Sequence, residues 1–168
     1  MLIIFETERL IVRSYTMDDI DHFFRLNGDK DVMRYIRPAQ TREQSKVFLR
    51  KIIAAYKERP GAGRWGMFST ENGEFVGSFA VIPVENSAML QMGYALLKEN
   101  WGKGYASESV KGGIEYVFGP LGLSAIAGIT FPENIASQKV LLKNGFVFDK
   151  TITEDGAELN LYMLYRPV

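Results

Sequence analysis

A glycine-rich segment at residues 101–108, WGKGYASE, has residue types and spacing that suit binding chemistry. Gly102 and Gly104 flank Lys103, and a run with helical periodicity follows. A glycine-rich turn that opens a helix directs several backbone N–H groups outward at the positive end of the helix dipole, and this arrangement binds anions such as phosphate. Glycines are also common in tight connections without any ligand. The segment alone therefore predicts either an anion site or a structural turn.

Two common phosphate-binding patterns do not match this segment. The P-loop pattern needs a glycine five residues before the Gly-Lys pair and a serine or threonine directly after it, but Leu97 and Gly104 stand there. A dinucleotide-binding fingerprint needs glycine where Ser107 stands, and it follows the first strand of a repeated parallel unit that this sequence lacks. Both of these phosphate-loop types are therefore excluded.

A strand and a helix are expected to position the glycine-rich segment. Residues 88–97 form an apolar strand that leads into it, and apolar residues at three- and four-residue spacings predict a helix over 106–118. A Gly-Pro pair ends this helix, and a short apolar strand follows at 123–131. A strand–helix–strand unit of this kind predicts one parallel pair of strands.

The remaining elements surround this unit. Further strands are expected at 8–15, 64–70, 74–84, 146–153 and 158–166, and further helices after Thr16, at 41–57 and after Asn134. The Asn72-Gly73 pair is typical of a hairpin turn, which makes the neighbouring strands antiparallel. We expect an α/β (α+β) fold, in which about four helices flank a mixed, mostly antiparallel sheet of six to seven strands.

In two helices the apolar spacing indicates which side chains are buried. In the helix at 41–57 the expected apolar stripe includes Val47, Phe48 and Ile52. In the helix after Thr16 the only histidine, His22, lies off the apolar stripe, so we expect it at the surface.

Composition limits the class of protein. The 168 residues fit one domain over 1–168, and 20 basic residues balance 20 acidic ones, so no general charge favours nucleic acid or a membrane surface. The first ten residues have neither a basic leader nor a long apolar run, so we expect a soluble cytoplasmic protein. No cysteine is present, which excludes a disulfide framework, thiolate metal ligands and a protein-thiol intermediate.

Three segments in a fixed order resemble one protein family. The segments are TERLIVRSYTMDD, MGYALLKENWGKGYASE and NIASQKVLLKNGF, and the resemblance extends from about Glu8 to Tyr165. The middle one is similar to the acyl-CoA pyrophosphate loop of the GNAT superfamily of N-acyltransferases, usually written Q/R-x-x-G-x-G/A. All three resemble the branch with the ribosomal-protein N-terminal acetyltransferases. Trp101 departs from the general loop pattern, and an aromatic residue at that position is frequent in this branch.

The resemblance implies an N-acetyltransferase that uses acetyl-CoA as cosubstrate, without a metal. It implies direct transfer in a ternary complex to a primary amine, either a peptide N-terminus or a small molecule. The chain would act as a monomer or a homodimer. The implied cofactor-binding residues are Tyr94, Ala95, Leu96, Trp101, Gly102, Lys103, Gly104, Tyr105, Ala106, Ser107, Asn134 and Ser137. Ser137 and Tyr94 are the implied catalytic residues.

The resemblance also assigns a role to each group. Amides from Gly102 to Ser107 would bind the CoA pyrophosphate. The strand at 88–97 would splay from the strand at 124–130, and pantetheine would lie between them against the main chain near Tyr94. A backbone N–H there would hold the thioester carbonyl. Gly93 suits either a local bulge or a plain strand position. The Ser137 hydroxyl would stabilise the departing CoA thiolate by a hydrogen bond, because serine is a much weaker acid than a thiol.

The general base is the open part of this interpretation. Family members often carry a carboxylate on the central strand, and the corresponding position here is Gln91, which cannot accept a proton. Glu85 and Glu133 are the acidic alternatives expected to face the cleft, and water is a third. Because of Gln91, a CoA-binding module with weak or no catalysis remains the alternative function.

The acceptor cleft is expected to be lined by aromatic side chains. The resemblance places its walls on the first two helices and the late hairpin. The candidates for this lining are Tyr35, Trp65, Tyr94 and Tyr162, although aromatic residues at these spacings also occur in cores.

Overall fold

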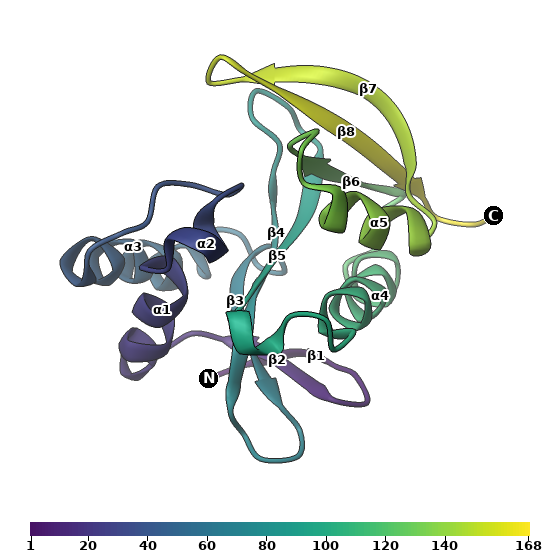
Figure 1. The fold of residues 1–168 in the computed structure, drawn as a ribbon. Helices are drawn as coiled ribbons and strands as arrows, with labels where there is room; N and C mark the ends of the chain where they lie inside the picture. Colours follow the sequence, from purple (N-terminus) through teal and green to yellow (C-terminus); the bar gives the residue numbers. More distant parts are fainter.

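The computed structural model describes residues 1–168 and contains one eight-stranded sheet (Figure 1). The strands lie in the order β1-β2-β3-β4-β5-β6-β8-β7. Their bounds are β1 (Ile3–Glu6), β2 (Leu10–Ser14), β3 (Gly63–Ser69), β4 (Phe75–Pro83), β5 (Leu90–Leu96), β6 (Ala125–Thr130), β7 (Val147–Glu154) and β8 (Ala157–Tyr165). Every neighbouring pair is antiparallel except β5 and β6, so the predicted mixed sheet with one parallel pair is confirmed.

The sheet has eight strands, one more than the upper end of the expected six to seven. Strand β1 is only four residues long and pairs with β2 at the edge of the sheet. Its side chains are exposed or half-buried, so its sequence carries little of the alternation that identifies a strand. Pairing with β2, rather than local sequence preference, accounts for this element.

Five α-helices cover the two faces of the sheet. Their bounds are α1 (Ile20–Asn27), α2 (Lys30–Met33), α3 (Arg42–Ala55), α4 (Tyr105–Phe118) and α5 (Ile135–Lys143). Helices α1 to α3 lie on one side of the central strands, and α4 and α5 lie on the other (Figure 1). One buried cluster includes Trp65, Phe79 and Val117, and a second includes Phe23 and Leu49. None of the helices has the length and apolar character needed to cross a lipid bilayer.

The buried face of α3 differs from the predicted stripe. Val47 is 50% exposed, whereas Ser45, Leu49 and Ile52 are buried. These three positions follow the i, i+4, i+7 spacing, so they share one face of the helix that packs toward α1 and the sheet. The prediction was right for Ile52 and for Phe48, which packs against the same cluster, and wrong for Val47. A polar residue, Ser45, is part of the buried face, so apolar spacing alone did not identify that face fully.

Strands β5 and β6 separate soon after they meet. Only Gln91 and Met92 of β5 have register partners in β6, namely Ala127 and Gly128. The splay implied by the family resemblance is therefore present. The bulge suggested at Gly93 is absent, because the register between β4 and β5 runs without a break through this residue.

Candidate active site

The glycine-rich segment forms a turn that needs its two glycines. Gly102 has φ 70° and Gly104 has φ 83°, values in the left-handed region that other residues adopt only with strain. Gly104 is the N-cap of α4, and the first backbone hydrogen bond of the helix runs from Glu108 N to Gly104 O. The amides of Tyr105, Ala106 and Ser107 precede that bond and have no acceptor within the helix. The turn therefore presents a row of free N–H donors at the positive end of α4, as an anion site requires.

An ion pair from the first part of the chain braces this turn. Arg9 Nε lies 2.6 Å from Glu108 Oε2, and the Arg9 backbone N–H donates to Glu108 Oε1 at 2.8 Å. Arg9 Nη1 also donates to the Lys103 carbonyl at 2.9 Å. Partial burial works against ionisation of Glu108, but hydrogen bonds from Thr7 and Arg9 keep its pKa below the ordinary value. This brace was missed in the sequence, although Arg9 belongs to the TERL segment that carried the resemblance.

Two predicted cofactor residues have structural contacts of their own. The indole Nε1 of Trp101 donates to the Leu96 carbonyl at 3.0 Å, which ties the turn to the end of β5. The Ser107 hydroxyl accepts a hydrogen bond from Asn144 at 3.1 Å and so joins α4 to the end of α5. Lys103 is exposed.

The splayed part of β5 has a free edge. Leu97 N–H donates to Val76 O in β4, and backbone groups of successive strand residues point to opposite edges. The backbone groups of Tyr94 and Leu96 therefore face away from β4, toward the gap beside β6. Because the Leu96 carbonyl is taken by Trp101, the Tyr94 N–H and carbonyl and the Leu96 N–H are the groups left for a ligand.

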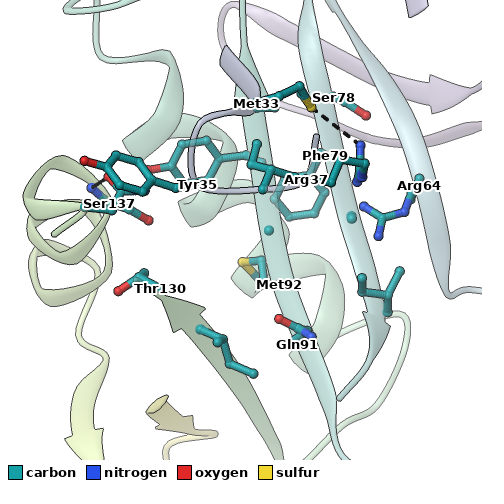
Figure 2. Close-up of a pocket in the computed structure, with 18 of the residues that line it drawn as sticks. Met33, Tyr35, Arg37, Arg64, Ser78, Phe79, Gln91, Met92, Thr130 and Ser137 are labelled. Carbon is teal, nitrogen blue, oxygen red and sulfur yellow. Dashed lines mark hydrogen bonds between the residues drawn. The ribbon is translucent and has the colours of Figure 1, made fainter. Parts of the chain in front are cut away.

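A cavity of about 340 Å³ opens at this gap (Figure 2). Tyr94, Ala95, Asn134 and Ser137 of the predicted set line it, together with Gly93 and Gln91. Ser137 is half-buried beside Tyr94. Burial raises the pKa of the Tyr94 hydroxyl, and the neighbouring Ser137 side chain offsets part of this rise. Leu96 and the turn at 101–107 lie outside this cavity. The structure therefore places the predicted residues in two groups, one around the cavity and one at the start of α4.

Asn134 acts as a helix cap. Its Oδ1 accepts the Ser137 N–H at 3.2 Å, which fixes the first turn of α5. The cap also orients the segment that carries Ser137 toward the cavity. The prediction of a further contact from Asn134 to pantetheine stays a prediction.

Thr130 is a cavity residue that the sequence did not indicate. It ends β6 and is 5% exposed, and its hydroxyl has no hydrogen-bond partner. A buried hydroxyl without a partner has a free energy cost, so it marks a position where a ligand or water completes the hydrogen bonding. No local pattern identified Thr130, because it lies within an ordinary apolar strand.

The carboxylate in the cavity is Glu154, not one of the predicted acids. Glu85 and Glu133 are exposed and do not line the cavity, whereas Glu154 does, from the end of β7. Its Oε1 atom is buried without a partner. Burial raises the pKa of Glu154, and the nearby charges of Glu85 and Asp155 raise it further.

Gln91 occupies the position expected from the family pattern. Its side chain lines the cavity and donates from Nε2 to the Pro83 carbonyl at 3.5 Å. The hairpin turn at 154–156 was recognised in the sequence only as a turn, so the position of Glu154 in the cavity was missed.

The aromatic candidates divide between the cavity and the core. Tyr35 and Tyr94 line the cavity. Trp65 and Tyr162 are 2% and 4% exposed and belong to the main hydrophobic cluster, so their assignment to the cleft was wrong. Both lie on strands whose inward face packs under a helix, where large aromatic side chains fill volume. His22 is exposed, as expected.

Comparisons with known proteins agree with this geometry. A family profile described as an acetyltransferase (GNAT) domain matches residues 9–147. YoaA of Bacillus subtilis (strain 168), an uncharacterized N-acetyltransferase, is 31% identical over 176 residues that cover 99% of each chain.

Two solved structures share the fold. An acetyltransferase of the GNAT family from Bacillus anthracis has a TM-score of 0.83 at 23% identity, over 96% of this chain and 97% of that one. RimL, a ribosomal L7/L12 alpha-N-protein acetyltransferase in complex with coenzyme A, has a TM-score of 0.80 at 17% identity, over 98% of each chain. With the family profile and the full-length relative, these findings show that the chain belongs to the GNAT family of acetyl-CoA-dependent N-acetyltransferases, which transfer an acetyl group to an amine.

Proposed function

We propose that this enzyme holds acetyl-CoA and a primary amine at the same time and transfers the acetyl group directly between them. The observation that carries the proposal is the cavity at the split between β5 and β6. It brings the free edge of β5, the Ser137 hydroxyl and the Glu154 carboxylate to one space. Since the chain has no cysteine, no protein thiol is present to carry the acetyl group between two half-reactions.

The residues of two regions fit the parts of acetyl-CoA. The free amides of Tyr105, Ala106 and Ser107, with the turn formed by Gly102 and Gly104, suit the pyrophosphate. The unpaired backbone groups of Tyr94 and Leu96 suit the amides of pantetheine. Acetyl-CoA supplies the activated acetyl thioester, and a backbone N–H on this edge would stabilise charge on its carbonyl oxygen.

Glu154 acts as the general base, and Ser137 acts as the hydrogen-bond donor to the leaving group. The amine nitrogen forms a bond to the acetyl carbon, the carbon–sulfur bond breaks, and CoA leaves with the electron pair of that bond. Glu154 accepts the proton that the nitrogen loses, because it is the cavity carboxylate and one of its oxygens is free of protein partners. The Ser137 hydroxyl donates a hydrogen bond to the departing thiolate, as the family pattern implies.

Initial-rate kinetics test direct transfer. CoA thiol release is measured with a panel of amines and short peptides while both substrates are varied. Intersecting double-reciprocal lines are expected for a ternary complex, and parallel lines would contradict it. If acetyl-CoA binds but no amine releases CoA above the enzyme-free rate, the protein is a CoA-binding module and the proposal fails.

The Ser137→Ala variant tests the role of the hydroxyl. We expect kcat to fall about tenfold, the size of one hydrogen bond to a charged group, while the affinity for acetyl-CoA is kept. Ser87→Ala, on the exposed β4–β5 turn outside the cavity, is the matched control. Unchanged turnover in Ser137→Ala would remove this residue from the mechanism.

The predictions of a monomer or homodimer and of a cytoplasmic location stay predictions.

A further inference from the structure

Two arginine side chains line the cavity and have no acidic partner. Arg37 follows α2, and Arg64 lies in β3. Each ion pair in the structure involves other basic residues, namely Arg9, Arg13, Arg25, Arg42 and Lys98. Arg37 Nη1 donates to the neutral Oδ1 of Asn27 at 2.6 Å, which orients its side chain without neutralising its charge.

The two guanidinium groups share one aromatic neighbour. Their central carbon atoms lie 5.0 Å and 5.7 Å from the centre of the Phe48 ring, for Arg37 and Arg64 respectively. Cation–π contact offsets part of the cost of removing the charges from water, but it supplies no countercharge. Figure 2 shows both groups at one side of the cavity, with Tyr35 and Ser137 at the other.

The surroundings of these charges are unfavourable in the absence of an anion. Burial lowers the pKa of Arg37 to about 10, and repulsion from Arg64 contributes to the shift. Burial also lowers the pKa of Arg64. The buried Tyr15 hydroxyl near them is neutral, because burial raises its pKa. Glu154 lines the same cavity but forms no ion pair with either arginine, and Asp19 is already paired with Arg13.

Partly buried charges without partners destabilise a fold, so their presence at a binding cavity points to a charge on the ligand. From this arrangement we infer that the acceptor amine carries an oxyanion, a carboxylate or a phosphate, which binds between Arg37 and Arg64. This inference rests on the proposed function, since it concerns the acceptor of the same reaction. Arginine forms paired hydrogen bonds with both oxyanions, so two arginines fix the orientation of such an acceptor.

The position of the arginines also restricts the shape of the acceptor. The anion binds at the Arg37 and Arg64 side, while the amine has to reach the thioester near Ser137, on the other side of the cavity. The cavity of about 340 Å³ suits a small molecule with its amine and its anion at different ends. An ω-amino acid or an aminoalkyl phosphate has this form.

Matched acceptor pairs test the inference. CoA release is measured for ω-amino acids of increasing chain length, for their primary amides, and for aminoalkyl phosphates. Loss of the anion removes charge-assisted hydrogen bonds, so kcat/KM for an amide is expected to be about 10- to 100-fold below that of the matching acid. Preference for acids over phosphates, or the reverse, identifies the oxyanion. Equal kcat/KM for acids and amides overturns the inference and leaves the proposed function intact.

Variants locate the effect in the two arginines. Arg37→Gln and Arg64→Gln are expected to abolish the preference for the acid, mainly by raising the KM for the acid. Arg64→Lys keeps the charge and is expected to retain part of the preference. Arg50→Gln, an exposed arginine on α3 outside the cavity, is the control. If Arg37→Gln and Arg64→Gln keep the full preference for the acid, as the control does, the anion binds elsewhere and the inference is wrong.

If Arg64 had only a structural role, its replacement would change protein stability and not the preference for the acid. Because Arg64 has no partner, Arg64→Gln is expected to leave Tm unchanged or to raise it, whereas loss of a structural ion pair would lower Tm. Calorimetry of the CoA-bound protein gives an independent test that does not need turnover. Acids or phosphates should bind to that complex and the amides should not. Absence of binding by every member of the panel overturns the inference, while failure to bind CoA overturns the proposed function as well.

Discussion

The cofactor side and the acceptor side that we propose for this site are built in different ways. Free backbone N–H groups in one continuous stretch, from β5 through the turn to the start of α4, make up the cofactor side. Side chains from separate parts of the chain make up the acceptor side, with Arg37 after α2, Arg64 in β3 and Glu154 at the end of β7. Main-chain sites depend on local conformation, whereas side-chain sites depend on which strands the fold brings together. Changes to the two sides should therefore affect different kinetic constants.

The largest effect is expected for Glu154→Gln on the acceptor side. Removal of a general base costs about 10²- to 10⁴-fold, so kcat should fall by at least about 100-fold. The KM for acetyl-CoA should be unchanged, because the cofactor contacts lie on the other side.

Protein stability provides the control for Glu154→Gln. Burial raises the pKa of Glu154, so the charged form is disfavoured in the folded state, and its removal at neutral pH should not lower Tm. Glu133→Gln, an exposed acid outside the cavity, should leave turnover unchanged. A Glu154→Gln enzyme with normal kcat would show that water accepts the proton or that the amine loses it without a base from the protein.

The cofactor side should respond most to a change of backbone conformation. Gly104→Val places a β-branched residue at φ 83°, and the strain should weaken acetyl-CoA binding by about 10- to 100-fold. The matched control is Gly73→Val, at φ 72° in a hairpin remote from the cavity, which should lower stability without a change in the KM for acetyl-CoA. Equal KM values in the two variants would contradict the role of the turn.

The same contrast explains what could be predicted from the sequence. The turn at Gly102 and Gly104 and the helix cap at Asn134 could be predicted because turns and caps have local signatures, and the structure confirms both elements. Arg37 and Arg64 could not, since they are 27 positions apart in the sequence and come together beside Phe48 only in the folded chain. The expected carboxylate position was filled by Gln91, and the acid that lines the cavity comes from a hairpin turn near the end of the chain.

An effect of pH should appear on the acceptor side. Glu154 has to be deprotonated to accept the proton from the amine, and burial, together with the charges of Glu85 and Asp155, raises its pKa. The acid limb of the kcat profile should therefore lie at a higher pH than that of an ordinary glutamate, with activity lost as pH falls through it. In Glu154→Gln this limb should disappear from the residual activity. Its persistence would assign the limb to another group.

The smallest effect is expected at the brace of the cofactor turn. Arg9 holds Glu108 and the Lys103 carbonyl, but its side chain is 43% exposed, so solvent screens much of the interaction. Arg9→Gln should raise the KM for acetyl-CoA only about threefold to fivefold, with kcat unchanged, because the glycines still set the backbone of the turn. Arg42→Gln removes a surface pair with Asp21 away from the turn and serves as the control. A fall in kcat with no change in this KM would place Arg9 on the acceptor side and would weaken the division between the two halves of the site.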